Sequence, residues 1–104
     1  MAMNMQFLMK QAQKIQNEIT KAQAELEEKT YEGSIGGGAI VIKVKGNNHV
    51  ESIVIDPDYI KDGDVAETQE MLKTCLNEIL TKIAADREAI LAPITGGAKF
   101  PGAL

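Results

Sequence analysis

The sequence predicts an α+β fold in which a long first helix precedes a three-stranded antiparallel meander and a second helix. Residues 5–29 contain neither Gly nor Pro and are rich in good helix formers. Between residues 30 and 55, apolar and polar residues alternate, as in strands that bury one face. From residue 64 the apolar residues return to helical spacing. At 104 residues, the chain has the length of one domain.

Composition narrows the classes of protein to consider. The net charge of −4 is unlike the strongly basic balance of many nucleic-acid-binding domains, although local patches count for more than totals. The single Cys cannot form an internal disulfide, which fits a reducing cytosol. The first 13 residues lack the apolar run of a signal peptide, and no apolar stretch is long enough to span a bilayer. We therefore expect a soluble, intracellular protein without membrane contacts.

The first helix, expected over about residues 4–29, carries an unbroken apolar seam. Its members recur at alternating intervals of three and four residues: Met5, Leu8, Ala12, Ile15, Ile19, Ala22 and Leu26. Such a helix is roughly 35–40 Å long, which is long for so small a domain. Either the seam packs only on the chain's own sheet and second helix, or it also pairs with a second copy. The narrow seam and the length favour pairing, with Leu8, Ala12, Ile15 and Ile19 as dimer contacts.

Polar residues form a second stripe opposite the seam. Lys10, Lys14, Asn17 and Lys21 follow one another at helical spacing, and Gln13 lies beside them. The simplest interpretation is a solvated helix face. The functional interpretation is a strip that contacts phosphates, in which the lysines supply charge and the two amides supply hydrogen bonds.

Three strands are expected at residues 30–35, 39–45 and 49–55. In the middle strand, Ile40, Ile42 and Val44 would point to one side. The segment Gly46–His49 is typical of a hairpin turn, because Gly and Asn tolerate positive φ. The glycine-rich run at 33–38 fits neither a dinucleotide fingerprint nor a P-loop, since a strand rather than a helix follows it. We expect a turn or bulge there.

The second helix is expected over about residues 64–91, after an acidic stretch from Asp58 to Glu70. Asp64 is placed as its N-cap, and Pro93 is expected to end it. The acidic stretch lacks the ligand register of an EF-hand, so we interpret it as a solvated helix cap. Residues 93–104 are expected to form a flexible tail.

Side chains for catalysis are scarce. The chain has one His, one Cys and one Arg. His49 falls at the hairpin tip and Cys75 beside the apolar stripe of the second helix, so no nucleophilic triad or zinc site can be assembled from them. We expect no enzymatic activity, no metal, no cofactor and no small-molecule substrate.

Three segments form a recognisable combination. Residues 8–16 read LMKQAQKIQ, the glycines at 33, 36, 38 and 46 lead to Ile55-Asp56-Pro57, and Thr95-Gly96-Gly97 is followed by Pro101-Gly102. In this order and at this length, the segments resemble the YbaB/EbfC family of bacterial nucleoid-associated proteins. Together they frame nearly the whole chain, and their combination is strongly specific.

The resemblance implies an α-β-β-β-α chain that forms a tweezers-shaped homodimer. It implies binding to double-stranded DNA with little sequence specificity, an altered DNA conformation, and consequences for gene expression and nucleoid organisation in the cytoplasm. No enzymatic activity and no cofactor are implied. Family DNA binding has been associated with the helical arms, which here places it on Lys10 and Lys14, with Lys21, Gln13 and Asn17 beside them. An alternative function is a protein-interaction adaptor for DNA repair or replication machinery.

Overall fold

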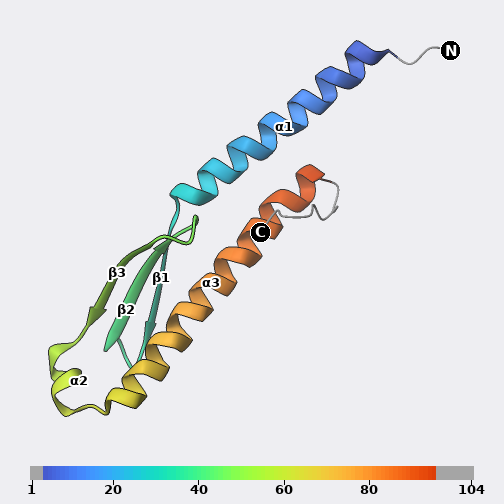
Figure 1. Cartoon of the computed structure of the whole chain (residues 1–104). Coiled ribbons are helices and arrows are strands. Elements are labelled where there is room, and N and C mark those ends of the chain that lie inside the picture. The colour runs from blue at the N-terminus through green and yellow to red at the C-terminus, as the bar shows by residue number, and fades with distance from the viewer. Residues whose placement is uncertain (1–3, 96–104) are drawn as a thin grey trace.

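The computed structural model describes residues 4–95, which form an elongated body of 76 × 19 × 18 Å. The elements in chain order are α1 (Met5–Glu28), β1 (Thr30–Ile35), β2 (Ile40–Lys45), β3 (Val50–Ile55), α2 (Pro57–Asp62) and α3 (Val65–Thr95). The body is long because α1 and the second half of α3 extend beyond the sheet on the same side (Figure 1). The expected order of a helix, three antiparallel strands and a helix is confirmed.

The sheet has the strand order β1-β2-β3, and both pairings are antiparallel. β1 pairs with β2 without interruption, from Thr30 opposite Lys45 to Ile35 opposite Ile40. The pairing of β2 with β3 shifts register between Lys43 and Val44. β2 and β3 each begin one residue later than the ranges expected from the sequence.

The core lies between the sheet and the first half of α3. Its buried side chains are Leu26, Tyr31, Ile40, Ile42, Val44, Cys75, Ile79 and Ile83. At Gly33 of β1 the absence of a side chain lets α3 approach, because an added Cβ would lie 2.7 Å from Cγ1 of Ile79. α3 packs mainly on β1 and β2, so the inward face of β3 is covered only in part: Ile55 packs against the core, whereas Ile53 is half exposed.

Two features differ from the sequence-based expectations. The acidic stretch contains a short helix, α2, which begins because the Asp56 carboxylate accepts a hydrogen bond from the Asp58 N–H at 2.9 Å and because Pro57 suits a first helical turn. The expectation that Pro93 ends the last helix is wrong, since α3 continues to Thr95. A proline so close to the helix end removes only one of the last helical hydrogen bonds.

The start of α3 is defined by a local contact. The Asp64 carboxylate accepts a hydrogen bond from the Ala66 N–H at 2.8 Å, as a cap does. Most of the tail expected at residues 93–104 lies outside the described residues, as do the Gly96-Gly97 and Pro101-Gly102 segments. Within residues 4–95, no helix combines the length and the apolar character that crossing a membrane requires.

Candidate nucleic-acid interface

α1 projects from the domain as an arm. The Asn4 side chain caps it by accepting a hydrogen bond from the Phe7 N–H at 3.2 Å. Leu26, in the last turn, is the residue of α1 that is buried in the core, whereas residues 5–18 are exposed. Figure 1 shows that the first turns of α1 extend past the end of α3. The arm therefore presents most of its surface to solvent.

The predicted lysine stripe lies on one exposed face of this arm. A shallow depression on the helix surface is lined by Lys10, Gln13, Lys14, Asn17, Glu18 and Lys21. Gln13 donates a hydrogen bond from Nε2 to Oδ1 of Asn17 at 3.0 Å, so the two amides act as a pair. Within residues 4–95, Lys10, Lys14 and Lys21 form no ion pair, although Glu18 is one turn from the last two. Their charges remain available to an external anion.

The charge of the chain is distributed unevenly along its length. Residues 4–24 contain three lysines and one glutamate, so this part of the arm is basic although the whole chain carries −4. α2 lies at the end of the molecule that is remote from the arm (Figure 1). There, α2 and the turn at Gly36–Gly38 line a hollow with five acidic side chains: Asp56, Asp58, Asp62, Asp64 and Glu67. Part of the net acidity therefore lies far from the lysine stripe, and Glu25, Glu27 and Glu28 add acidic charge at the base of the arm.

The apolar seam of α1 is covered only near the base of the arm. Ile19 and Ala22 are partly buried and Leu26 is fully buried. Further out, Met5 is 65% exposed and Ile15 is 43% exposed. Of the four expected dimer contacts, Leu8, Ala12 and Ile15 are therefore exposed and Ile19 is partly buried. The chain's own domain covers only the C-terminal end of the seam.

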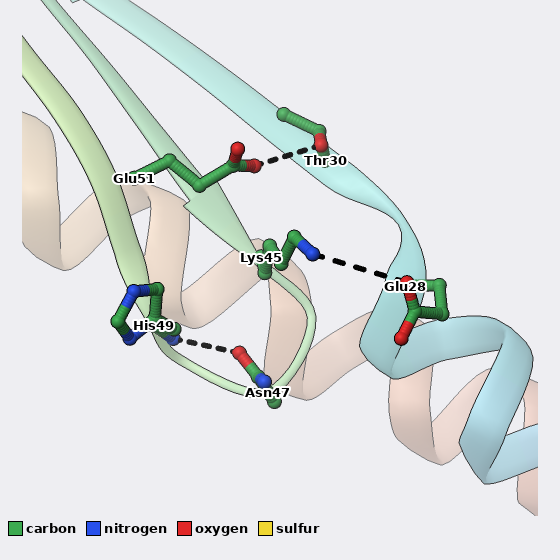
Figure 2. A network of polar contacts seen from close by, with 6 residues as sticks. All are labelled: Glu28, Thr30, Lys45, Asn47, His49 and Glu51. Atoms are coloured by element: carbon green, nitrogen blue, oxygen red, sulfur yellow. Dashed lines mark hydrogen bonds and ion pairs between the residues drawn. The ribbon is translucent and has the colours of Figure 1, made fainter.

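Polar contacts with the β2–β3 hairpin hold the base of the arm. Nζ of Lys45 lies 3.8 Å from a carboxylate oxygen of Glu28, the last residue of α1 (Figure 2). Across the sheet, the Thr30 hydroxyl donates to the Glu51 carboxylate at 2.9 Å (Figure 2). These exposed contacts are individually weak, but the first joins the end of α1 to β2, and the second joins β1 to β3 just beyond that end.

Three segments meet at a junction beneath this hairpin. The Gly46 N–H donates to the Lys29 carbonyl at 2.9 Å, and the Gly46 carbonyl accepts from Nη2 of Arg87 at 2.9 Å. The Tyr31 hydroxyl donates to Oδ2 of Asp86 at 2.7 Å, and Nζ of Lys29 lies 3.5 Å from the same oxygen and 5.0 Å from the Tyr31 ring centre. The junction ties the base of α1 to the hairpin and to the middle of α3. It therefore sets the direction of the arm.

The Tyr31–Asp86 hydrogen bond gives the junction a measurable pH dependence. Burial and the Asp86 carboxylate raise the pKa of Tyr31 from 10.0 to about 12, while the Tyr31 hydroxyl and then Lys29 lower the pKa of Asp86. Because the folded-state pKa of Tyr31 is raised, its stabilising contribution is complete below pH 10 and is lost as the pH rises through about 12. The contribution of Asp86, whose pKa is lowered, is lost as the pH falls through that lowered value.

Replacing Tyr31 by phenylalanine tests this contribution. Tyr31→Phe should lower the free energy of unfolding at neutral pH, because it removes the hydrogen bond to Asp86. The difference from the wild type should shrink between pH 10 and about 12, where the wild type loses the same interaction. Urea unfolding followed by circular dichroism at several pH values measures both effects. The control is Tyr59→Phe, because the Tyr59 hydroxyl donates to Sδ of Met71 at 2.8 Å and not to a carboxylate. A difference that stays constant across the alkaline range would contradict the prediction.

Within residues 4–95, the single histidine and the single cysteine do not belong to a cluster that could bind a metal ion. His49 is exposed in the hairpin, where its backbone N–H donates a hydrogen bond to Oδ1 of Asn47 at 2.9 Å (Figure 2). Asn48 has the positive φ of 69° that is expected of such a turn. Cys75 is buried, and burial raises the pKa of its thiol. Within residues 4–95, no three metal-ligating side chains converge on a common point.

Comparison with known proteins identifies the family to which this arm and sheet belong. The profile of the YbaB/EbfC DNA-binding family matches residues 1–98. The chain belongs to the YbaB/EbfC DNA-binding family. This family is one of DNA-binding proteins and not one of enzymes.

Curated relatives of the chain align over almost its entire length. A nucleoid-associated protein of Clostridium novyi is 39% identical over 100 residues, which are 96% of this chain and 88% of that protein. Another, from Alkaliphilus metalliredigens, is 41% identical over 101 residues, which are 97% of this chain and 89% of that protein. An uncharacterised Helicobacter pylori protein of known crystal structure has a TM-score of 0.78 at 17% identity, over 91% of this chain and 100% of its own. At that identity, the likeness supports the shared fold.

Proposed function

We propose that this protein is a nucleoid-associated protein that binds double-stranded DNA as a homodimer, with little sequence preference, and alters the conformation of the duplex. One observation carries the proposal: three lysines without ion-pair partners in the described chain share an exposed face of the arm, in a chain of a DNA-binding family. The curated relatives are named nucleoid-associated proteins, which supports a place in the nucleoid, within the cytoplasm.

The exposed part of the seam supports the homodimer. A second copy that packs its own α1 against Leu8, Ala12, Ile15 and Ile19 would cover apolar surface that the single chain leaves in water. Such pairing leaves the lysine stripe on the outer side of each arm, because stripe and seam lie on opposite faces of α1. A pair of arms would then carry two basic strips, which face outward on opposite sides of the pair.

The chemistry of the stripe supports contact with the phosphate backbone. Lys10, Lys14 and Lys21 would neutralise phosphates and release the counterions condensed on DNA. Gln13 and Asn17 would add hydrogen bonds that position the duplex. Contacts to phosphates carry no direct sequence information, which accounts for little sequence preference.

A salt titration of duplex binding tests the proposal. In the Lys10→Ala/Lys14→Ala variant, the log–log slope of affinity against salt concentration should fall by about 1.8 if one copy contacts the duplex and by about 3.6 if both do. The matched control is Lys61→Ala/Lys73→Ala, which removes the same charge from the opposite end of the molecule and should leave the slope nearly unchanged. A wild-type protein that binds no duplex at low salt would exclude DNA binding and favour the adaptor function, with the acidic hollow as the surface for a partner.

A further inference from the structure

Phe7 is an exposed aromatic residue at the outer end of the arm, with 57% of its surface accessible. It precedes Lys10 by three residues and Lys14 by seven, so its ring lies on the lysine face of α1. Leu8, the next residue, belongs to the seam and points about 100° away around the helix axis. The lysine face therefore has an apolar ring at its outer end.

Pairing of the arms would not bury this ring. A second α1 along the seam would cover Met5 and Leu8, on the side of the helix away from Phe7. Met9 is also strongly exposed, at 66%, but it lies beside the seam because it follows Met5 by one helical turn. Phe7 is thus the large apolar side chain of α1 that remains beside the phosphate-binding lysines when the seam is paired.

We propose that Phe7 is a wedge that inserts partly between two base pairs of the duplex held by Lys10 and Lys14. This inference rests on the proposed function. Along the helix axis the two lysines follow Phe7 by roughly 4.5 and 10.5 Å, so they can hold the backbone beside the step that the ring enters. Apolar side chains, including Phe, act in this way in proteins that bind the minor groove, and they kink the duplex by unstacking one step.

The wedge also specifies which DNA should respond most strongly. Pyrimidine–purine steps such as TA and CA unstack most easily, so insertion there opposes binding least. Phosphate contacts alone would not distinguish such steps. The wedge therefore predicts a modest preference for duplexes with a flexible step, and it supplies a physical route to the altered DNA conformation.

The experiment uses the full chain and duplexes that carry 2-aminopurine at a central TA step. The wild type should increase the 2-aminopurine fluorescence as the base unstacks, and Phe7→Ala should abolish the increase. The variant should bind roughly tenfold more weakly, with an unchanged salt slope because no phosphate contact is lost. Met9→Ala, the matched control two residues away, should behave as the wild type. The wild-type chain contains no Trp, so the Phe7→Trp variant has a single indole. Bound duplex should quench the fluorescence of this indole.

The outcomes separate this inference from the proposed function. If the wild type binds duplex with a steep salt dependence, but Phe7→Ala matches it in affinity and in 2-aminopurine signal, the wedge is overturned and the DNA-binding function stands. Dissociation of the dimer by Phe7→Ala in sedimentation would also overturn the wedge, because it would assign the ring to the interface between copies. Absence of duplex binding by the wild type would overturn both.

Discussion

Replacement of Gly46 by alanine is expected to destabilise the protein by about 3 kcal/mol or more. A Cβ added at this position would fall onto the carbonyl oxygen of Leu26 and would lie 2.6 Å from its carbonyl carbon. Both groups are backbone, and Leu26 is buried in the core, so no flexible side chain can yield. The last turn of α1 would have to move away from the hairpin, which would break the Gly46–Lys29 hydrogen bond and release the arm from its base.

Urea unfolding measures this loss, and Gly37→Ala is its control. Gly37 has a positive φ of 68° but open space around it, so alanine there should cost only about 1–2 kcal/mol of backbone strain. The larger effect at Gly46 would come from the close approach of two backbone segments. Equal losses at the two glycines would show that the arm base can adjust, and that the hairpin does not hold α1 in place.

Features that depend on neighbours in the sequence were predicted best. The alternation through Ile40, Ile42 and Val44 predicted the buried face of β2, and those three side chains are fully buried. The spacing from Lys10 to Lys21 predicted one helix face, and the structure places these lysines around one depression. Such patterns are readable because helical and strand periodicities follow from local backbone geometry. The role of that face in DNA binding stays a prediction.

The junction at the arm base could not be read from the sequence. Tyr31 and Asp86 are 55 positions apart, and only the packing of α3 against β1 brings them to 2.7 Å. The sequence offers a Tyr at an inward strand position, but it does not name the group that its hydroxyl meets. Helix boundaries were missed for a related reason, since α2 and the continuation past Pro93 depend on caps and end effects that compete closely with turns.

Replacement of Ile15 by aspartate is expected to abolish the proposed homodimer while the domain stays folded. Ile15 is on the exposed part of the seam, eleven residues before the buried Leu26, so the core between sheet and α3 makes no use of it. In a paired seam, the same position would bury an aspartate against the partner's apolar residues, and an unpaired charge there is strongly unfavourable. Because Ile15 is not part of the core of the single chain, its replacement should affect assembly and leave folding intact.

Sedimentation of the variant at micromolar concentration, together with circular dichroism, measures both quantities. The matched control is Gln13→Asp, which places the same charge two residues earlier, on the face of α1 away from the seam, and should leave the dimer intact. A dimer that survives Ile15→Asp would show that the copies pair elsewhere, with the open inward face of β3 at Ile53 as the next candidate. If the duplex contacts the stripes of both copies, Ile15→Asp should also reduce the salt slope of DNA binding towards that of a single arm, because the pairing that holds the two stripes together is lost.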